Sequence, residues 1–369
     1  MIAKRKAGSE MTNIESLLFY ILIFGVSGIC MALYENQRKN IRVVFLFVAL
    51  ILPVLLAAFR VDVGTDYAAY KGLLEWEMNQ SFLQILREYK MYETGFKIIV
   101  KIATIPRSMV FVWGILAFIP TFLIFYTLKT QYKNISISVA YMVYLHVFFS
   151  ASLNIVRQYV AVAIVFWGIK FIFENKFWKY LCVVLVAMTI HRSAFIVLPF
   201  YFMWDHKKNK MAGKLKVGVI SGVLCIGVVM WTPILSIVMS IVPVLNKYRY
   251  LITGNGGSNR DIFLKLVLLF IGILFYKYYK NKDERMMLFV YALFVSLIMG
   301  VTGYHTTFLK RISLYYEVPM IVLFGYLPSF FKSNGRVLVK FGIYLYALGW
   351  FVLMAFVLGQ ADLIPYQWR

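Results

Sequence analysis

Residues 109–128 read MVFVWGILAFIPTFLIFYTL, and none of these 20 side chains is charged. A helix of this length crosses a hydrocarbon core of about 30 Å, because each residue adds roughly 1.5 Å along the helix axis. Lipid requires every backbone polar group to be bonded within the protein, so only helices and closed barrels cross a membrane. A run with so few polar residues lacks the alternating apolar and polar pattern of a barrel strand. The stretch therefore predicts an all-α membrane protein.

The rest of the chain repeats this pattern. Of the 369 residues, 62% are hydrophobic and 15% are charged, whereas a soluble domain carries roughly 25% charged residues. This composition excludes a soluble enzyme and a disordered chain. We predict a polytopic transmembrane helical bundle that forms a single domain over residues 1–369, with residues 1–14 as an N-terminal tail. Its predicted spans, about 12 in number, are residues 15–34, 43–59, 109–128, 135–150, 155–174, 177–190, 193–204, 215–235, 262–279, 285–301, 312–329 and 336–357.

The distribution of charge predicts the orientation of these spans. The net charge of +23 lies in short Lys/Arg islands between the apolar runs, and basic loops of membrane proteins stay in the cytoplasm. This pattern fits a membrane protein better than a nucleic-acid-binding protein. Residues 60–92 and 239–261 are then outer loops. Residues 93–105 are amphipathic and too short to span, so we expect an interfacial or re-entrant helix there.

No motif in the sequence predicts a metal or a cofactor. The three cysteines, Cys30, Cys182 and Cys225, lie inside apolar runs, which argues against a disulfide framework or a zinc site. The sequence contains no Cys/His pairing, no paired-carboxylate spacing and no Gly-rich phosphate loop. We therefore expect no cofactor and no nucleic-acid partner.

Polar and ionisable residues gather at the outward ends of the helices, where they are costly unless they line a watery cavity. Each has a simpler explanation: an arginine can anchor a span, Asn154 can cap its helix, and Glu93 can serve its own helix and Lys97. Random anchoring would divide such residues between the two leaflets. The predicted topology instead sends them to one leaflet, which predicts a shared outward recess formed by Arg60, Asp66, Glu93, Asn154, Arg157, Gln158, His191 and Arg311.

The depth of His191 follows from the basic residues on both sides of residues 177–204. Both flanks are rich in lysine and belong to the cytoplasm, yet residues 177–190 number only 14 and reach roughly 21 Å as a helix. The chain therefore turns before it reaches the outer surface. This places His191 in a recess, where its surroundings can set its protonation.

The residue types in this recess suit a diphosphate-linked sugar. Guanidinium groups bind phosphate oxygens through paired hydrogen bonds and keep their charge. Amide, carboxylate and phenol groups suit sugar hydroxyls, and a polyprenyl tail can lie between the helices. Such a site has no need of a nucleotide.

The ordered residues Arg60…Gly64-Thr-Asp-Tyr67, Tyr92-Glu93, Asn154-x-x-Arg157-Gln158, His191-x-Ser193 and Arg311 with Tyr315 resemble the EpsG family of Wzy-type polysaccharide polymerases over about residues 60–320. The family often has Pro after the Glu, where this chain has Thr94. The resemblance implies a membrane glycosyltransferase that polymerises polyprenyl-diphosphate-linked oligosaccharide repeats into capsular or exopolysaccharide. It implies the outer face of the bacterial cytoplasmic membrane, with membrane lipid, a chain-length regulator and a flippase of the same pathway as partners.

The roles that follow are hypotheses. His191 or Asp66 would accept the proton of the acceptor hydroxyl, while Arg157 and Arg311 would neutralise the leaving diphosphate; these four are the predicted catalytic residues. The predicted substrate-binding residues are Arg60, Tyr67, Glu93, Asn154, Gln158, Arg192, Ser193 and Tyr315.

Other functions stay open. An O-antigen-ligase-like transferase uses the same donor, and only the acceptor separates it from a polymerase. A lipid-linked-glycan flippase or transporter would carry charges at several depths, and an O-acyltransferase would meet its acyl donor from the cytoplasm.

Overall fold

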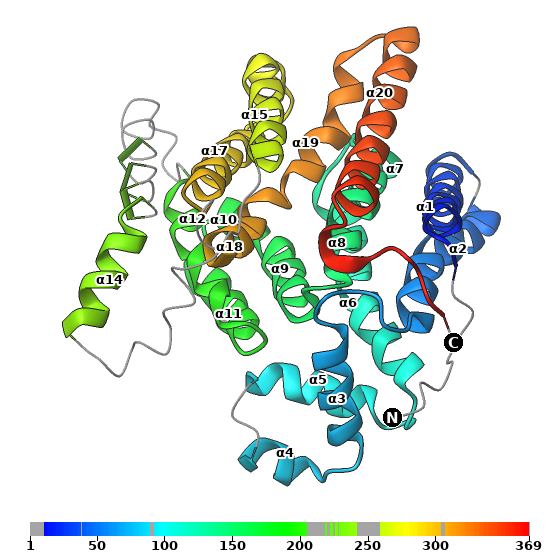
Figure 1. Cartoon of the computed structure of the whole chain (residues 1–369). Coiled ribbons are helices and arrows are strands. Elements are labelled where there is room, and N and C mark those ends of the chain that lie inside the picture. The colour runs from blue at the N-terminus through cyan, green and yellow to red at the C-terminus, as the bar shows by residue number, and fades with distance from the viewer. Residues whose placement is uncertain are drawn as a thin grey trace. The chain divides into compact units, whose positions relative to one another are not determined.

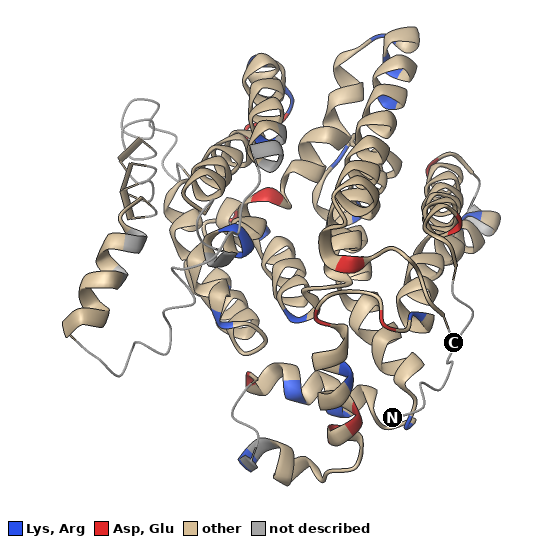
Figure 2. Cartoon of the chain, viewed as in Figure 1, with Lys and Arg blue, Asp and Glu red and all other residues tan. Residues whose placement is uncertain are grey.

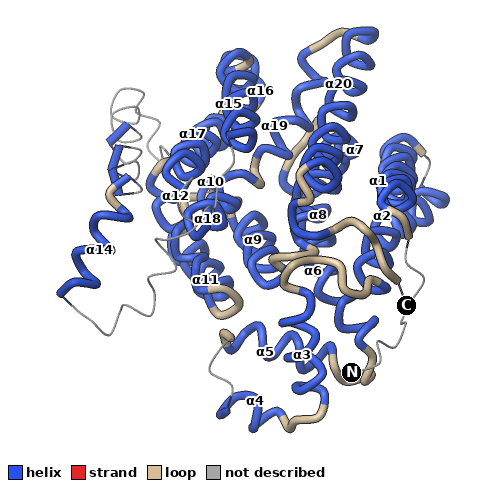
Figure 3. Tube along the Cα trace, in the orientation of Figure 1, coloured by secondary structure: helices blue, strands red, loops and turns tan. Residues whose placement is uncertain are grey.

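The computed structural model describes residues 11–37, 39–88, 92–204, 229–241, 259–303 and 307–368, together with 218–219, 222–223 and 226–227. Over these residues the chain is helical, and no strand is formed (Figure 3). This confirms the all-α prediction. Four predicted segments lie partly outside the described residues: the tail 1–14, the outer loops 60–92 and 239–261, and the span 215–235.

Five of the described helices are long and apolar enough to cross a membrane: Asn13–Asn36, Ile41–Phe59, Met109–Gln131, Val156–Phe173 and Ser333–Val357. Each matches a predicted span to within a few residues. Shorter apolar helices stand where five other spans were predicted, or close to them, at Ile137–Ser152, Phe177–Met188, Arg192–Phe202, Lys265–Leu274 and Met286–Thr302. The chain is a membrane protein by this criterion, and the count of about 12 spans stays a prediction.

The chain divides into two compact units. The first comprises Met1–Trp167, Val186–Arg192 and Phe324–Arg369, and the second comprises Gly168–Leu185 and Ser193–Leu323. Each unit is described by itself below, and the single domain over 1–369 stays a prediction.

The first unit is built around long helices. Helix α1 packs along α2, and α2 packs along α6 (Figure 1). Thr12 starts α1 with a reciprocal capping box, in which its hydroxyl accepts the Glu15 N–H and its own N–H donates to the Glu15 carboxylate. The helices of this unit are α1 (Asn13–Asn36), α2 (Lys39–Phe59), α3 (Tyr67–Met78), α4 (Phe82–Glu88), α5 (Thr94–Ala103), α6 (Met109–Gln131), α7 (Ile137–Val143), the π-helix Tyr144–Phe149, α8 (Ser150–Ser152), α9 (Val156–Gly168) and α20 (Ser333–Phe351), which continues as a π-helix to Val357.

Several charged residues of this unit lie at helix ends and in the segment 60–92. Lys332, Arg336 and Lys340 stand at the beginning of α20, and Figure 2 shows blue Lys/Arg segments at one end of this helix. The segment 60–92, predicted as an outer loop, contains α3 and α4. Helix α5 confirms a short helix within residues 93–105.

A C-terminal strap, residues 359–368, runs back over the turn that follows α2. The turn donates three backbone hydrogen bonds to it: Val61 N to Gln367 O at 2.8 Å, Gly64 N to Asp362 O at 2.9 Å and Thr65 N to Ala361 O at 3.2 Å. The strap thereby supplies acceptors for three backbone N–H groups of the turn, two of which, those of Val61 and Gly64, belong to buried residues.

The second unit contains the shorter helices. Within it α17 packs against both α15 and α18, and the Tyr180 hydroxyl donates to the carbonyl of Val197, which ties α11 to the return segment after His191. Its helices are α10 (Lys170–Phe173), α11 (Phe177–Met188), the 3₁₀ helix Arg192–Val197, α12 (Leu198–Phe202), α14 (Trp231–Ile241), α15 (Asn259–Leu274), α16 (Tyr276–Lys282), α17 (Met286–Thr302), α18 (Thr307–Glu317) and α19 (Met320–Tyr326).

Candidate active site

The turn after α2 is held by the residue pair that precedes α9. The Asn154 side-chain oxygen accepts hydrogen bonds from the Thr65 hydroxyl at 2.7 Å and from the Asp66 N–H at 2.8 Å. Asn154 therefore joins two elements and does not cap its own helix. Gly64 has φ +105°, and a Cβ there would stand 3.1 Å from the Leu153 carbonyl oxygen. Only glycine permits both this backbone conformation and this close approach without strain.

Arg60 lies beneath this turn and is only 2% exposed. Its guanidinium donates to the carbonyl of Leu153 and stacks over the Trp113 ring, 4.6 Å from the centroid. Burial lowers the pKa of Arg60 to about 10, which leaves it charged at neutral pH. Tyr67 is also buried, stacks on Trp113 at 5.1 Å and points its hydroxyl to the Arg60 carbonyl. The side chains of Arg60 and Tyr67 therefore pack against the turn and stabilise it.

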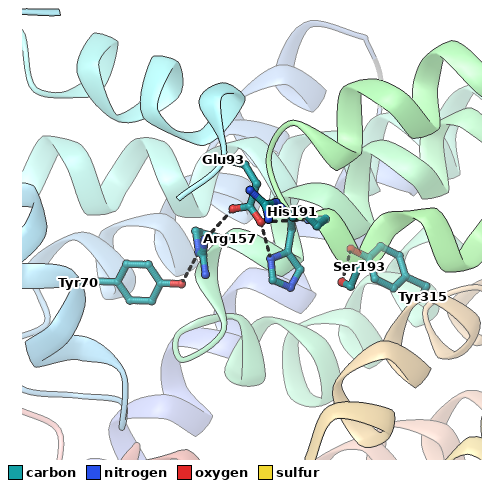
Figure 4. Close-up of polar contacts among 7 residues, drawn as sticks. Tyr70, Glu93, Arg157, His191, Ser193 and Tyr315 are labelled. Carbon is teal, nitrogen blue, oxygen red and sulfur yellow. Dashed lines mark hydrogen bonds and ion pairs between the residues drawn. The ribbon is translucent and has the colours of Figure 1, made fainter. Parts of the chain in front are cut away.

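A carboxylate at the start of α5 connects three segments of the first unit. Arg157, in the first turn of α9, places Nη1 2.7 Å from Glu93 Oε2 (Figure 4). The same guanidinium donates from Nε to the Tyr70 hydroxyl at 3.2 Å and lies 4.1 Å from the centroid of the Tyr92 ring. The ion pair and the cation–π contact fix Arg157 from two sides.

The second oxygen of Glu93 faces the turn that follows α11. Oε1 accepts the backbone N–H of Arg192 at 3.1 Å and lies 4.0 Å from His191 Nδ1. Glu93 occupies the N-cap position of α5, yet its side chain makes no capping bond there. The simpler explanation, that Glu93 serves its own helix, therefore does not describe this side chain.

Gly95 brings these two segments together. Its N–H donates to the Thr189 carbonyl at 2.7 Å, and a Cβ at this position would lie 2.2 Å from Thr189 Oγ1. A larger residue would push α5 away from the turn that carries His191. Sequence reasoning missed Gly95, and it also missed Tyr70, whose spacing of three from Tyr67 on a helix was a usable signal.

The polar side chains differ in exposure. The side chains of Arg157, His191 and Glu93 are 18%, 25% and 12% exposed, so all three are partly accessible. Gln158 is buried, Asp66 and Asn154 are half-buried, and Arg192 is exposed. Within the described ranges, no group of three or more His, Cys, Asp and Glu side chains is arranged to hold a metal ion.

The remaining predicted residues belong to the second unit. The Ser193 hydroxyl lies 3.3 Å from the Tyr315 hydroxyl (Figure 4), and both side chains are buried. Arg311 is exposed on α18, one helical turn before Tyr315. In the first unit Asp66 thus meets Asn154, and Glu93 meets Arg157, His191 and the backbone of Arg192; the convergence of these residues with Arg311 stays a prediction.

Comparison with known proteins adds one decisive observation. A profile of the EpsG family matches residues 42–368, almost the whole chain. The chain belongs to the EpsG family. The matched range of this EpsG-family protein includes both the Glu93 cluster and the C-terminal strap. A search of curated proteins and a search of solved structures gave no match.

EpsG-family membership suggests a role like that of a polysaccharide polymerase. It also agrees with the long apolar helices of a membrane protein. The donor, the acceptor and the side of the membrane require a proposal.

Proposed function

We propose that this EpsG-family protein extends a glycan on a polyprenyl diphosphate carrier at the outer face of the cytoplasmic membrane. The growing glycan would be the donor, and the non-reducing-end hydroxyl of a fresh lipid-linked repeat would be the acceptor. The observation that supports this most directly is the partly exposed cluster of Arg157, Glu93 and His191, which joins a fixed cation to a candidate base.

Each reacting group finds a counterpart in this cluster. The acceptor oxygen bonds to the anomeric carbon while the bond from that carbon to the diphosphate oxygen breaks. Charge develops on the departing diphosphate, where Arg157 would stabilise it. The acceptor hydroxyl's proton would pass to His191. Atoms and charge balance without a nucleotide or a metal as co-reactant.

An apolar cavity supports the lipid part of the proposal. It has a volume of about 430 Å³ and lies between α2 and α6, with Val54, Ala58, Phe111 and Gly114 among its lining residues. Binding sites for small molecules commonly fall in this range of size and are mostly apolar. We assign this cavity to a segment of the isoprenoid chain.

Reconstitution tests the proposal. The purified protein in liposomes, given a lipid-linked repeat and no nucleotide, should produce a ladder of longer glycans. Arg157→Ala and His191→Ala should each lower the rate of extension by about 100-fold or more, because each loses a group that acts on the reacting atoms. Arg336→Ala, an exposed arginine at the start of α20, should keep the wild-type ladder.

Three outcomes would contradict the proposal. Normal ladders from both site variants would reject the site. A folded wild-type protein that moves the lipid-linked repeat across the bilayer without extending it would be a flippase. Transfer of glycan to a different acceptor, with no chain growth, would identify an O-antigen-ligase-like transferase.

A further inference from the structure

We infer that Glu93 is a positioning residue that orients His191 and Arg157 for the transfer, an inference that rests on the proposed function. The sequence predicts that Glu93 binds substrate, but the contacts of its carboxylate in the structure are with protein groups. Both oxygens of Glu93 face protein donors, since Oε2 pairs with Arg157 Nη1 at 2.7 Å and Oε1 accepts the Arg192 N–H at 3.1 Å.

The position of the imidazole supports this role. His191 Nδ1 lies 4.0 Å from Glu93 Oε1, and contacts of this kind often tighten to hydrogen bonds only when substrate is bound. A carboxylate on the Nδ1 side keeps a proton on Nδ1 and leaves Nε2 as the acceptor. Nε2 is then the atom that takes the acceptor hydroxyl's proton, and the carboxylate stabilises the imidazolium that results.

The surrounding charges define what a change at Glu93 would do. His191 faces the Glu93 carboxylate from the start of α5, which also binds the Arg157 guanidinium from α9 and accepts the backbone N–H of Arg192 from the turn of His191 itself. Tyr70 from α3 holds the far side of Arg157. Removing the negative charge takes away the attraction that favours the imidazolium and leaves the Arg157 charge uncompensated by Glu93, which disfavours the imidazolium.

The test compares Glu93→Gln and Glu93→Asp with the wild type. Glu93→Gln should still extend glycan, but at a rate about 10- to 100-fold below that of the wild type. The acid limb of its pH–rate profile should move to lower pH by roughly one unit. Glu93→Asp should restore the wild-type acid limb in part. A matched control is Glu35→Gln, because Glu35 accepts the Ser138 N–H at 3.0 Å at the start of α7 and should leave the pH profile unchanged.

A second measurement does not depend on polymerisation. In ¹⁵N-histidine NMR of the full chain in detergent, with His191→Ala identifying the signal, the His191 titration midpoint should fall in Glu93→Gln. An unchanged midpoint overturns the inference even where activity changes. Loss of all activity at every pH in both Glu93 variants, with folding intact, overturns it in favour of Glu93 as the base. Failure of the wild type to extend glycan rejects the proposed function, and the NMR result still decides the role of Glu93.

Discussion

At the scale of single residues, Glu77 on α3 is a buried acid that burial keeps from ionising readily. Its side chain is 0% exposed, and neither carboxylate oxygen has a hydrogen-bond partner among the described residues. Burial raises the pKa of Glu77 to about 7, against the attraction of Lys97 and Lys101. The Lys101 ammonium is turned instead to backbone carbonyls, with Gln80 O at 2.6 Å. Ionising Glu77 therefore costs stability.

The raised value predicts a pH-dependent effect of Glu77→Gln. A carboxyl whose pKa is higher in the folded state stabilises the protein below its unfolded pKa, and that contribution is lost as pH rises to about 7. At pH 8 the variant should be more stable than the wild type by about 2–3 kcal/mol, which raises its apparent Tm, and at pH 4.5 the two proteins should unfold at nearly the same Tm. Thermal unfolding in detergent at both pH values measures this difference. An equal change at both would show that the charge of Glu77 has no part in it.

At the scale of helices, α18 is anchored in the second unit by a buried ion pair. Glu317 of α18 meets Lys265 of α15 at 2.8 Å, and Ser313 and Ser296 donate to the same carboxylate at 2.5 and 3.1 Å. Ser313 and Glu317 are four residues apart and form one stripe of the helix. Arg311 and Tyr315, which are also four residues apart, form a different stripe of α18. The ion pair therefore fixes the rotation of α18 about its own axis.

The ion pair predicts a strong asymmetry between single and double variants. Glu317→Ala leaves Lys265 buried and unpaired, which should cost about 3–5 kcal/mol, whereas Lys265→Met with Glu317→Leu removes both charges and should lie close to the wild type. Monodispersity and thermal unfolding in detergent compare the two variants. A double variant as unstable as the single one would mean that packing, and not the unpaired charge, accounts for the loss.

At the scale of the whole molecule, the prediction is the sidedness of the first unit. Asp62, after α2, and Lys133, after α6, are exposed, and the positive-inside rule assigns them to opposite sides. In a background in which Cys30, Cys182 and Cys225 are replaced by serine, Asp62→Cys should react with an impermeant maleimide on intact cells. Lys133→Cys should react only after permeabilisation. The reverse pattern would turn the Glu93 cluster toward the cytoplasm and contradict the proposed site of polymerisation.

The helices could be predicted from sequence because lipid imposes a local rule. The apolar run 109–128 is found in α6, Met109–Gln131, and its ends are marked by residues next to it in the chain. Glu93, Arg157 and His191 could be named as candidates for the same reason, since ionisable groups are costly near hydrocarbon wherever they occur. The cost of placing an ionisable group near hydrocarbon, however, does not predict which of these residues contact one another.

Only the tertiary structure decided the partners. Glu93 reaches Arg157 across 64 positions of sequence, Gly95 abuts Thr189, and the C-terminal strap covers the turn after α2. Arg60, expected at a binding surface, is buried against Trp113. Hydropathy and charge report how each residue interacts with lipid and water, whereas these contacts depend on how helices distant in sequence pack against one another, which no local pattern encodes.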